Sequence, residues 1–130
     1  SFFNSLELCT RVVTRLRGAL EPDEQAELAT AVTGVEMNGD DLMKIGERIT
    51  NVERAFNIRE GMGRKDDTLP KVFLTEQQGP WGPTGISEEK FQVMLDEYYQ
   101  FKGWSKEGIP SKQKLNELGL GYIAKQIGAV

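Results

Sequence analysis

Apolar residues recur along most of the chain at alternating spacings of three and four, the pattern of amphipathic helices. The clearest case is the segment 40–60, where this spacing places five side chains on one face: Leu42, Ile45, Ile49, Val52 and Phe56. Further helices are predicted over residues 2–17, 21–34, 87–101, 111–118 and 122–127. The pattern therefore predicts an all-α protein, an irregular multi-helix domain without internal repeats.

Local signals mark the expected ends of these helices. They are Pro22 at a first helical position, Asp40, Ser87 and Ser111 as N-caps, and Gly61 and Gly119 as stops. In the segment 87–101 the expected apolar face consists of Phe91, Met94, Leu95 and Tyr98, with Tyr99 on its flank. Charged residues outside the apolar stripe of 40–60, among them Arg54, are expected to be solvated or paired.

The segment 61–86 is different because it holds five glycines, three prolines and one tryptophan. This Gly/Pro-rich composition excludes a regular helix and predicts a long connecting segment. Connections of about 25 residues are unusual in a compact domain, and they are mostly functional or wrapped around a partner. Residues 72–74 are the one candidate for an extended segment, with no partner strand evident elsewhere in the chain.

Composition excludes several classes of function. The chain has 130 residues with one cysteine and no histidine. It therefore has no intrachain disulfide, no Ser-His-Asp or Cys-His nucleophile and no self-contained zinc or iron–sulfur site. A balance of 16 basic against 20 acidic residues, net −4, argues against a nucleic-acid partner. No apolar run could span a bilayer and no secretory signal is visible, so a cytoplasmic protein is expected.

Two short motifs offer local chemistry. The acidic pair 66–67 follows the basic pair 64–65 just beyond a predicted helix end. One interpretation is a site that binds a cation or acts as an acid–base pair. The other, which we favour, is structural: the basic pair complements the negative end of the helix dipole, and the acids balance the charge of the basic pair. The glycine runs 61–63 and 79–85 match no phosphate-binding motif and predict turns.

Three single residues have two interpretations each. Trp81 and Trp104 are interpreted as packing anchors rather than as stacking partners for a ligand. Cys9 lies among apolar residues and is either a buried small side chain or a ligand or nucleophile. The apolar start of the chain further suggests a piece of a longer polypeptide, because natural N-termini usually fray.

Several strings resemble one known family. They are 46–49 (GERI), 51–61 (NVERAFNIREG), 64–70 (RKDDTLP), 94–99 (MLDEYY), 103–104 (GW), 108–110 (GIP), 114–115 (KL) and 118–120 (LGL). In their order and spacing they resemble the C-terminal domain of the tungsten-containing aldehyde:ferredoxin oxidoreductase family. The resemblance covers nearly the whole chain, and its strings look structural rather than catalytic.

The resemblance implies that residues 1–130 are the C-terminal, third domain of an enzyme of roughly 600 residues. In that family the cofactors are a tungsten bis-pyranopterin (tungstopterin) and a [4Fe–4S] cluster, three of whose cysteines precede this domain. The fourth belongs to a segment Asp-x-x-Gly-Leu-Cys, which corresponds here to residues 4–9. The resemblance thus implies Cys9 as an iron ligand and Asn4, Leu8 and Thr10 as pterin contacts. No catalytic residue near tungsten maps onto this chain.

Two positions depart from the family's segment. Asn4 stands where the family has aspartate, so the charge that would accept pterin N–H groups is lost. Glu7 replaces a glycine and adds a side chain where the family pattern lets the backbone approach closely. The added side chain predicts a differently shaped loop, and the two departures together hint at a divergent branch of the family.

The implied reaction is the oxidation of an aldehyde to a carboxylic acid, with electrons leaving through the cluster to ferredoxin or an iron–sulfur subunit. Further implied partners are the upstream domains of the same chain, around which 61–86 would wrap, and other subunits of a homo- or hetero-oligomer. One alternative within the family is the catalytic tungsten subunit of a benzoyl-CoA reductase, which acts on an acyl-CoA. The alternative from another class is a non-catalytic helical interaction module with Cys9 merely buried.

Overall fold

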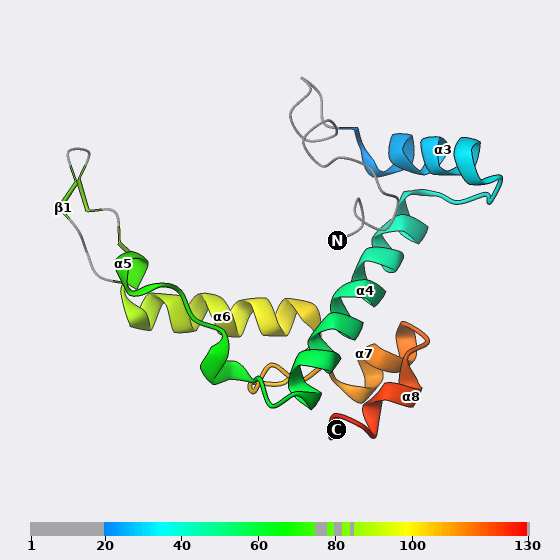
Figure 1. Ribbon diagram of the computed structural model, residues 1–130. Helices are drawn as coiled ribbons and strands as arrows, with labels where there is room; N and C mark the ends of the chain where they lie inside the picture. Colours follow the sequence, from blue (N-terminus) through cyan, green and yellow to red (C-terminus); the bar gives the residue numbers. More distant parts are fainter. Residues whose placement is uncertain (1–19, 75–77, 80–81, 84, 130) are drawn as a thin grey trace. The chain divides into compact units, whose positions relative to one another are not determined.

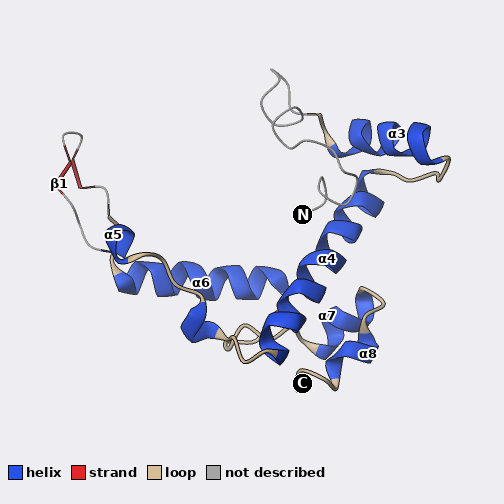
Figure 2. Ribbon diagram, viewed as in Figure 1, coloured by secondary structure: helices blue, strands red, loops and turns tan. Residues whose placement is uncertain are grey.

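The computed structural model describes residues 20–74, 78–79, 82–83 and 85–129, and its described part is helical (Figure 1). The elements are α3 (Pro22–Thr33), α4 (Gly39–Arg59), the 3₁₀ turn η1 (Arg64–Asp66), α5 (Lys71–Leu74), β1 (Gln78–Gly79), β2 (Gly82–Pro83), α6 (Glu88–Lys102), α7 (Lys112–Glu117) and α8 (Gly121–Ala124). Figure 2 shows that the strands of the described part form only a small hairpin, so the all-α prediction is confirmed.

The chain divides into two compact units, Ser1–Glu53 and Arg54–Val130, which are described separately. None of the helices in the described ranges is long and apolar enough to cross a membrane.

In the first unit, α3 begins at Pro22 as predicted and ends at Gly34, which has a φ of 73°. The backbone N–H of Glu21 donates to the Glu24 carboxylate at 2.8 Å, which satisfies one of the free donors of the first turn. The buried side chains of this helix are the small ones, Ala26 and Ala29.

The N-cap predicted for α4 was misplaced by two residues. The helix begins at Gly39, and Asp40 lies inside its first turn. The cap is Asn38, whose Oδ1 accepts from the N–H of Asp41 at 3.0 Å, while the Asp41 carboxylate accepts from the N–H of Asn38 at 3.1 Å. Asparagine is as good a cap as aspartate, and here the reciprocal pair decides between them.

The apolar stripe of α4 exists but is mostly not buried. Of its five members only Leu42 is fully buried, and Phe56 is 55% exposed. The buried side chains of the C-terminal half are Asn51, Arg54 and Ala55, which the helical period places about 100–160° around the helix from Phe56. Arg54, which was expected to be solvated or paired, is therefore paired and buried.

The end of α4 was predicted correctly. Gly61 has a φ of 89°, its N–H donates to the carbonyl of Ile58 at 2.9 Å, and the N–H of Met62 donates to Asn57 at 3.0 Å. This pair of hydrogen bonds closes the helix around a left-handed residue, a conformation that glycine adopts without strain.

The Gly/Pro-rich segment contains more local structure than the sequence suggested. The extended conformation expected for 72–74 is wrong, because these residues belong to the single helical turn α5. Proline suits the start of a helix, and the carbonyl of Pro70 accepts from the N–H of Phe73 at 2.9 Å. The hairpin pairs Gln78 with Pro83 and Gly79 with Gly82 in antiparallel register.

The predicted caps of α6 and α7 are confirmed. The Ser87 hydroxyl accepts from the N–H of Lys90 at 3.3 Å, and that of Ser111 accepts from Lys114 at 3.1 Å. Gly119 ends α7 with a φ of 68°. The hydrophobic core of the second unit joins the end of α4 to α7 and α8 and consists of Ala55, Leu115, Leu118, Leu120, Ile123, Ala124 and Ile127.

Candidate functional site

The residues predicted to contact cofactors lie outside the described part of the chain. Asn4, Leu8, Cys9 and Thr10 all fall within 1–19, so their roles stay predictions, and Trp81 is likewise not described. In the described ranges, no group of three or more histidine, cysteine or carboxylate side chains could hold a metal ion.

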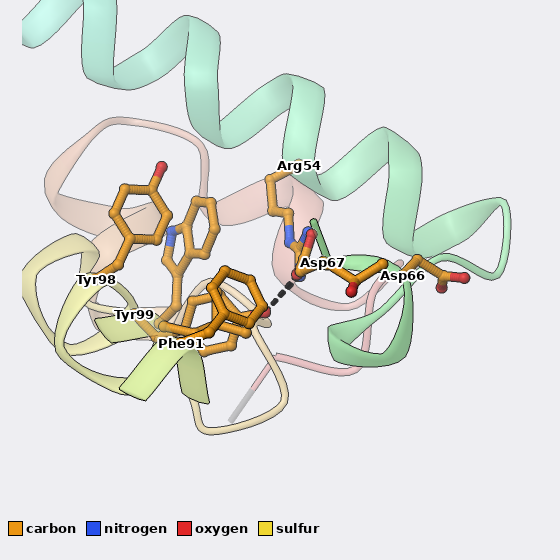
Figure 3. Close-up of a pocket in the computed structure, with 9 residues that line it drawn as sticks. Arg54, Asp66, Asp67, Phe91, Tyr98 and Tyr99 are labelled. Atoms are coloured by element: carbon orange, nitrogen blue, oxygen red, sulfur yellow. Dashed lines mark hydrogen bonds and ion pairs between the residues drawn. The ribbon is translucent and has the colours of Figure 1, made fainter. Parts of the chain in front are cut away.

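The most connected polar arrangement of the described residues lies in the second unit, where Arg54, Asp67, Tyr99 and Trp104 meet beside a hollow (Figure 3). We call these four residues the Arg54 cluster. They come from α4, from the residue that follows η1, from α6 and from the loop after it. Segments far apart in sequence are therefore tied together by one buried cation.

Arg54 and Asp67 form a two-pronged ion pair. Nη1 of Arg54 donates to Oδ1 of Asp67 at 2.8 Å, and Nη2 donates to Oδ2 at 2.6 Å. The side chain of Arg54 is 8% exposed and that of Asp67 is 24% exposed. Such a fork matches the planar guanidinium to both carboxylate oxygens, and it is among the strongest hydrogen-bonded pairs in proteins.

Two more groups complete the coordination of this ion pair. The Tyr99 hydroxyl donates a short hydrogen bond to Oδ2 of Asp67, and Figure 3 shows it reaching the carboxylate from α6. Nε of Arg54 donates to the carbonyl of Gly108 at 2.8 Å. Gly108 has a φ of 74°, and a methyl group there would overlap both the Arg54 guanidinium and the Tyr99 ring. The loop can pass this close only because position 108 is glycine.

Aromatic rings cover the guanidinium. The central carbon of Arg54 lies 5.1 Å from the centre of the Trp104 ring and 5.8 Å from that of Tyr99. Trp104 in turn meets Tyr98 edge-on, with ring centres 5.7 Å apart. Contacts of this kind attract a cation to the ring faces and remove it from water. The interpretation of Trp104 as a packing anchor agrees with this geometry.

The predicted buried face of α6 was partly wrong. Tyr99, expected on the flank, is 2% exposed, whereas Tyr98, expected in the core stripe, is 44% exposed. Met94 is exposed too, and Leu95 is buried as predicted. The physical reason is that α6 is rotated so that the Tyr99 hydroxyl reaches Asp67. The spacing of apolar residues carries no information about such a polar contact.

The contacts of residues 64–67 differ in part from both interpretations given for them. Arg64 reaches α6 and the following loop, donating to Asp96 at 2.5 Å, to Gln92 at 2.8 Å and to the carbonyl of Lys106 at 2.8 Å. Asp66 accepts from the N–H of Gly63 at 2.8 Å. Only Asp66 thus has a local partner, whereas Asp67 and Arg64 each bind residues far away along the chain.

The surroundings shift the acid–base behaviour of the cluster. Burial alone would raise the pKa of Asp67, but hydrogen bonds from Arg54 and Tyr99 and the Arg54 charge outweigh it, so this pKa is lowered. Burial would lower the pKa of Arg54, yet hydrogen bonding and attraction to Asp67 raise it on balance. Burial, together with the hydrogen bond to Asp67 and its charge, raises the pKa of Tyr99 to about 12. All three groups are locked in their ordinary protonation states near neutral pH.

The hollow beside the cluster has a volume of about 320 Å³ and is lined further by Phe91, Leu95 and Tyr98. In the described part of the chain, no buried side-chain nitrogen or oxygen lacks a hydrogen-bond partner. The ion pair is therefore saturated by protein groups, and its chemistry is that of a structural tie rather than of an acid–base catalyst.

Periodicity missed this cluster, but one signal pointed towards it. Arg54, Asp67, Tyr99, Trp104 and Gly108 all lie within the strings that resemble the oxidoreductase family. Those strings were interpreted as structural, and the described cluster gives that interpretation a physical basis.

Comparison with known proteins defines the class. The family described as "Aldehyde ferredoxin oxidoreductase, domains 2 & 3" matches residues 1–120. The chain belongs to the aldehyde ferredoxin oxidoreductase family.

Among its relatives, the tungsten-containing aldehyde ferredoxin oxidoreductases of Pyrococcus furiosus and Pyrococcus horikoshii are each 42% identical over 102 residues. Each match covers 78% of this chain and 17% of the relative. An aliphatic sulfonate oxidoreductase, WOR-like subunit, of Pyrococcus furiosus is 25% identical over 108 residues.

A solved structure shares the fold. The active site complex BamBC of benzoyl coenzyme A reductase, in complex with 1,5-dienoyl-CoA, matches with a TM-score of 0.75 and 30% identity. The match covers 95% of this chain and 18% of that chain. The chain therefore spans less than a fifth of the length of the proteins it matches.

Proposed function

We propose that this chain is the C-terminal domain of a cytoplasmic tungsten oxidoreductase that converts aldehydes to carboxylic acids. Aldehyde and water yield the acid, two protons and two electrons, and ferredoxin accepts the electrons. The observation that carries the proposal is the family match over residues 1–120 together with 42% identity to tungsten-containing aldehyde ferredoxin oxidoreductases. The saturated Arg54 cluster agrees with a supporting role for this domain.

Within that enzyme the domain supplies groups to the cofactors and performs no catalytic step itself. Cys9 would bind one iron of a [4Fe–4S] cluster as a thiolate, and Asn4, Leu8 and Thr10 would contact a pterin. The cluster supplies single-electron transfer between the tungsten centre and the acceptor. Asn4 in place of aspartate keeps an acceptor oxygen but no charge, so its pterin contact would be weaker than the family's.

The test uses the full-length protein that contains this chain. Purified without oxygen, it should contain tungsten and iron and reduce ferredoxin when an aldehyde is added. The Cys9→Ala variant should lose the cluster's absorption and much of its iron, while Ser5→Ala, four residues earlier, should keep both. Unchanged iron in Cys9→Ala would remove the ligand assignment. A full-length protein without tungsten or iron would instead favour a non-catalytic helical module.

The benzoyl-CoA reductase structure supports a second candidate in the same family. It covers 95% of this chain at 30% identity, so the fold alone does not separate the two chemistries. In the reductase case electrons would flow to an aromatic acyl-CoA rather than away from an aldehyde. Parallel assays with aldehydes and with an aromatic acyl-CoA decide between the two, because each candidate predicts turnover in only one of them.

A further inference from the structure

Positive charge is concentrated in one short stretch of a chain that is negative overall. Residues 102–114 hold four lysines and one acid, Glu107, whereas the whole chain has a net charge of −4. Four lysines against one glutamate give this stretch +3, so the rest of the chain carries −7. We call the four lysines the lysine patch: Lys102, Lys106, Lys112 and Lys114.

The loop between α6 and α7 brings these lysines together. The N–H of Ser111 donates to the carbonyl of Gly103 at 3.1 Å, so the loop folds back on itself. Lys114 lies against Gly103, because a methyl group on that glycine would be 3.2 Å from Cε of the lysine. Lys112 follows Ser111, and Lys106 lies three residues beyond Gly103. At about 3.6 Å of reach per residue, the backbone of every lysine in the patch lies within roughly 11 Å of residue 103.

The patch is accessible to a partner. Lys106 and Lys112 are exposed, and Lys102 and Lys114 are half-buried. None of Lys102, Lys106 and Lys112 forms an ion pair with another residue that the structure describes. Their charges are therefore available to a molecule in solution.

Nearby acids leave most of this charge uncompensated. Asp96 is paired with Arg64, and Glu97 lies about 140° around α6 from the end of the helix at position 102. Glu107 in the loop and Glu117 at the end of α7 are both exposed. With these two glutamates counted, the patch keeps a net charge of +2.

Two exposed aromatic rings adjoin the patch. Nζ of Lys102 lies 5.7 Å from the ring centre of Tyr98 and 5.8 Å from that of Phe101. These rings are 44% and 79% exposed. Aromatic side chains are enriched at the centres of protein interfaces, and charged ones lie at the rims. The patch thus has the composition of a surface that another protein contacts.

The electron acceptor of the proposed function fits this surface. A [4Fe–4S] cluster bound by four thiolates is negative overall, because the thiolates outweigh the positive charge of the iron–sulfide core. A small carrier protein with such a cluster near its surface is attracted by clustered lysines. Electron-transfer proteins meet through small interfaces, below about 1,200 Å² in total, and lysines gathered within roughly 11 Å fit under one of them.

We propose that the lysine patch, together with Phe101, is the surface on which an acidic iron–sulfur carrier of the ferredoxin type docks to collect electrons. The inference rests on the proposed function for the identity of the partner. It adds that this domain, rather than the upstream part of the enzyme, provides the docking contacts.

Ferredoxin reduction by the full-length holoenzyme tests the patch. The double variant Lys106→Glu/Lys112→Glu should fold, since both side chains are exposed and an acid at position 112 suits the first turn of α7. At low ionic strength its kcat/KM for ferredoxin should fall about tenfold, mainly through a higher KM. The difference should shrink with added salt, because the Debye length drops from about 30 Å at 0.01 M to about 3 Å at 1 M.

The matched control is Lys44→Glu/Lys90→Glu. It changes the net charge by the same amount at two exposed lysines outside the patch. Its kcat/KM for ferredoxin should stay within about twofold of the unmodified enzyme. Equal losses in the two double variants would mean that overall charge steers the carrier, and no loss in either would mean that it docks elsewhere. Both results overturn the inference.

A small dye separates this inference from the proposed function. Benzyl viologen accepts electrons without a protein docking surface, so aldehyde oxidation with the dye should be the same in all three proteins. An unmodified enzyme that oxidises no aldehyde with the dye contradicts the proposed function. Normal oxidation with the dye, and unchanged ferredoxin kinetics in Lys106→Glu/Lys112→Glu, contradicts only the docking surface.

Crosslinking tests the contact without any turnover. A carbodiimide joins a lysine amine directly to a carboxylate that touches it. A mixture of the full-length protein and a [4Fe–4S] ferredoxin should give a one-to-one product, joined through lysines of the patch and lost at high salt. Products joined only through other lysines, such as Lys44 or Lys90, would overturn the inference, as would no product at all.

Discussion

Replacing Asp67 by asparagine should loosen the second unit more than any other isosteric change in the Arg54 cluster. Asp67→Asn keeps the shape of the side chain but turns one carboxylate oxygen into an N–H₂ group. In either orientation that group would face an Arg54 donor, Nη1 at the Oδ1 position or Nη2 at the Oδ2 position, where the wild-type carboxylate accepts. Arg54, whose side chain is 8% exposed, would be left as a buried charge with too few acceptors.

The magnitude follows from burial. Breaking a fully buried ion pair by removing one partner costs about 3–5 kcal/mol, because the remaining charge is uncompensated. Asp67 keeps 24% of its side-chain surface exposed, so the lower end, about 3 kcal/mol, is expected. At 1.4 kcal/mol per factor of ten, this corresponds to a rise of roughly 100-fold in the opening equilibrium of the unit.

Hydrogen exchange in the full-length protein measures this opening locally, so it does not require the whole enzyme to unfold in one step. Peptides from α6 and from the loop 103–110 should exchange about 100-fold faster in Asp67→Asn, as long as exchange follows the opening equilibrium. Asp66→Asn is the control. Its single bond to the N–H of Gly63 is exposed and is worth about 1 kcal/mol or less. If the two variants exchange alike, the Arg54–Asp67 pair does not stabilise the unit as argued.

Three further predictions concern the same unit. The folded protein raises the pKa of Tyr99 from 10.0 to about 12, so the contribution of this phenol to stability is complete below pH 10 and is lost as the pH rises through 12. In an absorbance titration, the difference between the wild type and Tyr99→Phe should show one tyrosine that ionises near pH 12. Gly108→Ala should lower the folded yield far more than Gly34→Ala, which has nearly the same φ but nothing within 4 Å of the added methyl. Ser111→Ala removes a cap worth about 1 kcal/mol, so exchange should quicken about fivefold in α7 and little elsewhere.

Much of the fold could be predicted because its signals are local. The serine caps at 87 and 111 and the glycine stops at 61 and 119 each act within a few residues of chain, so their sequence context suffices. The predictions for Asp40 and for 72–74 were wrong where two local signals competed. At the start of α4 an asparagine two residues earlier was the better-placed cap, and after Pro70 a helical turn replaced an extended segment.

The sequence by itself determined several helix ends, those at Ser87, Ser111, Gly61 and Gly119, because capping is a property of neighbouring residues. It also carried the family strings within which Arg54, Asp67 and Tyr99 lie. Only the tertiary structure decided what those residues do. The partners of Arg54 lie 13, 45 and 54 positions away along the chain, and no local pattern encodes such pairs. For the same reason only the tertiary structure decided that α6 buries Tyr99 and leaves Tyr98 at the surface, since one polar contact across the fold sets the rotation of the helix.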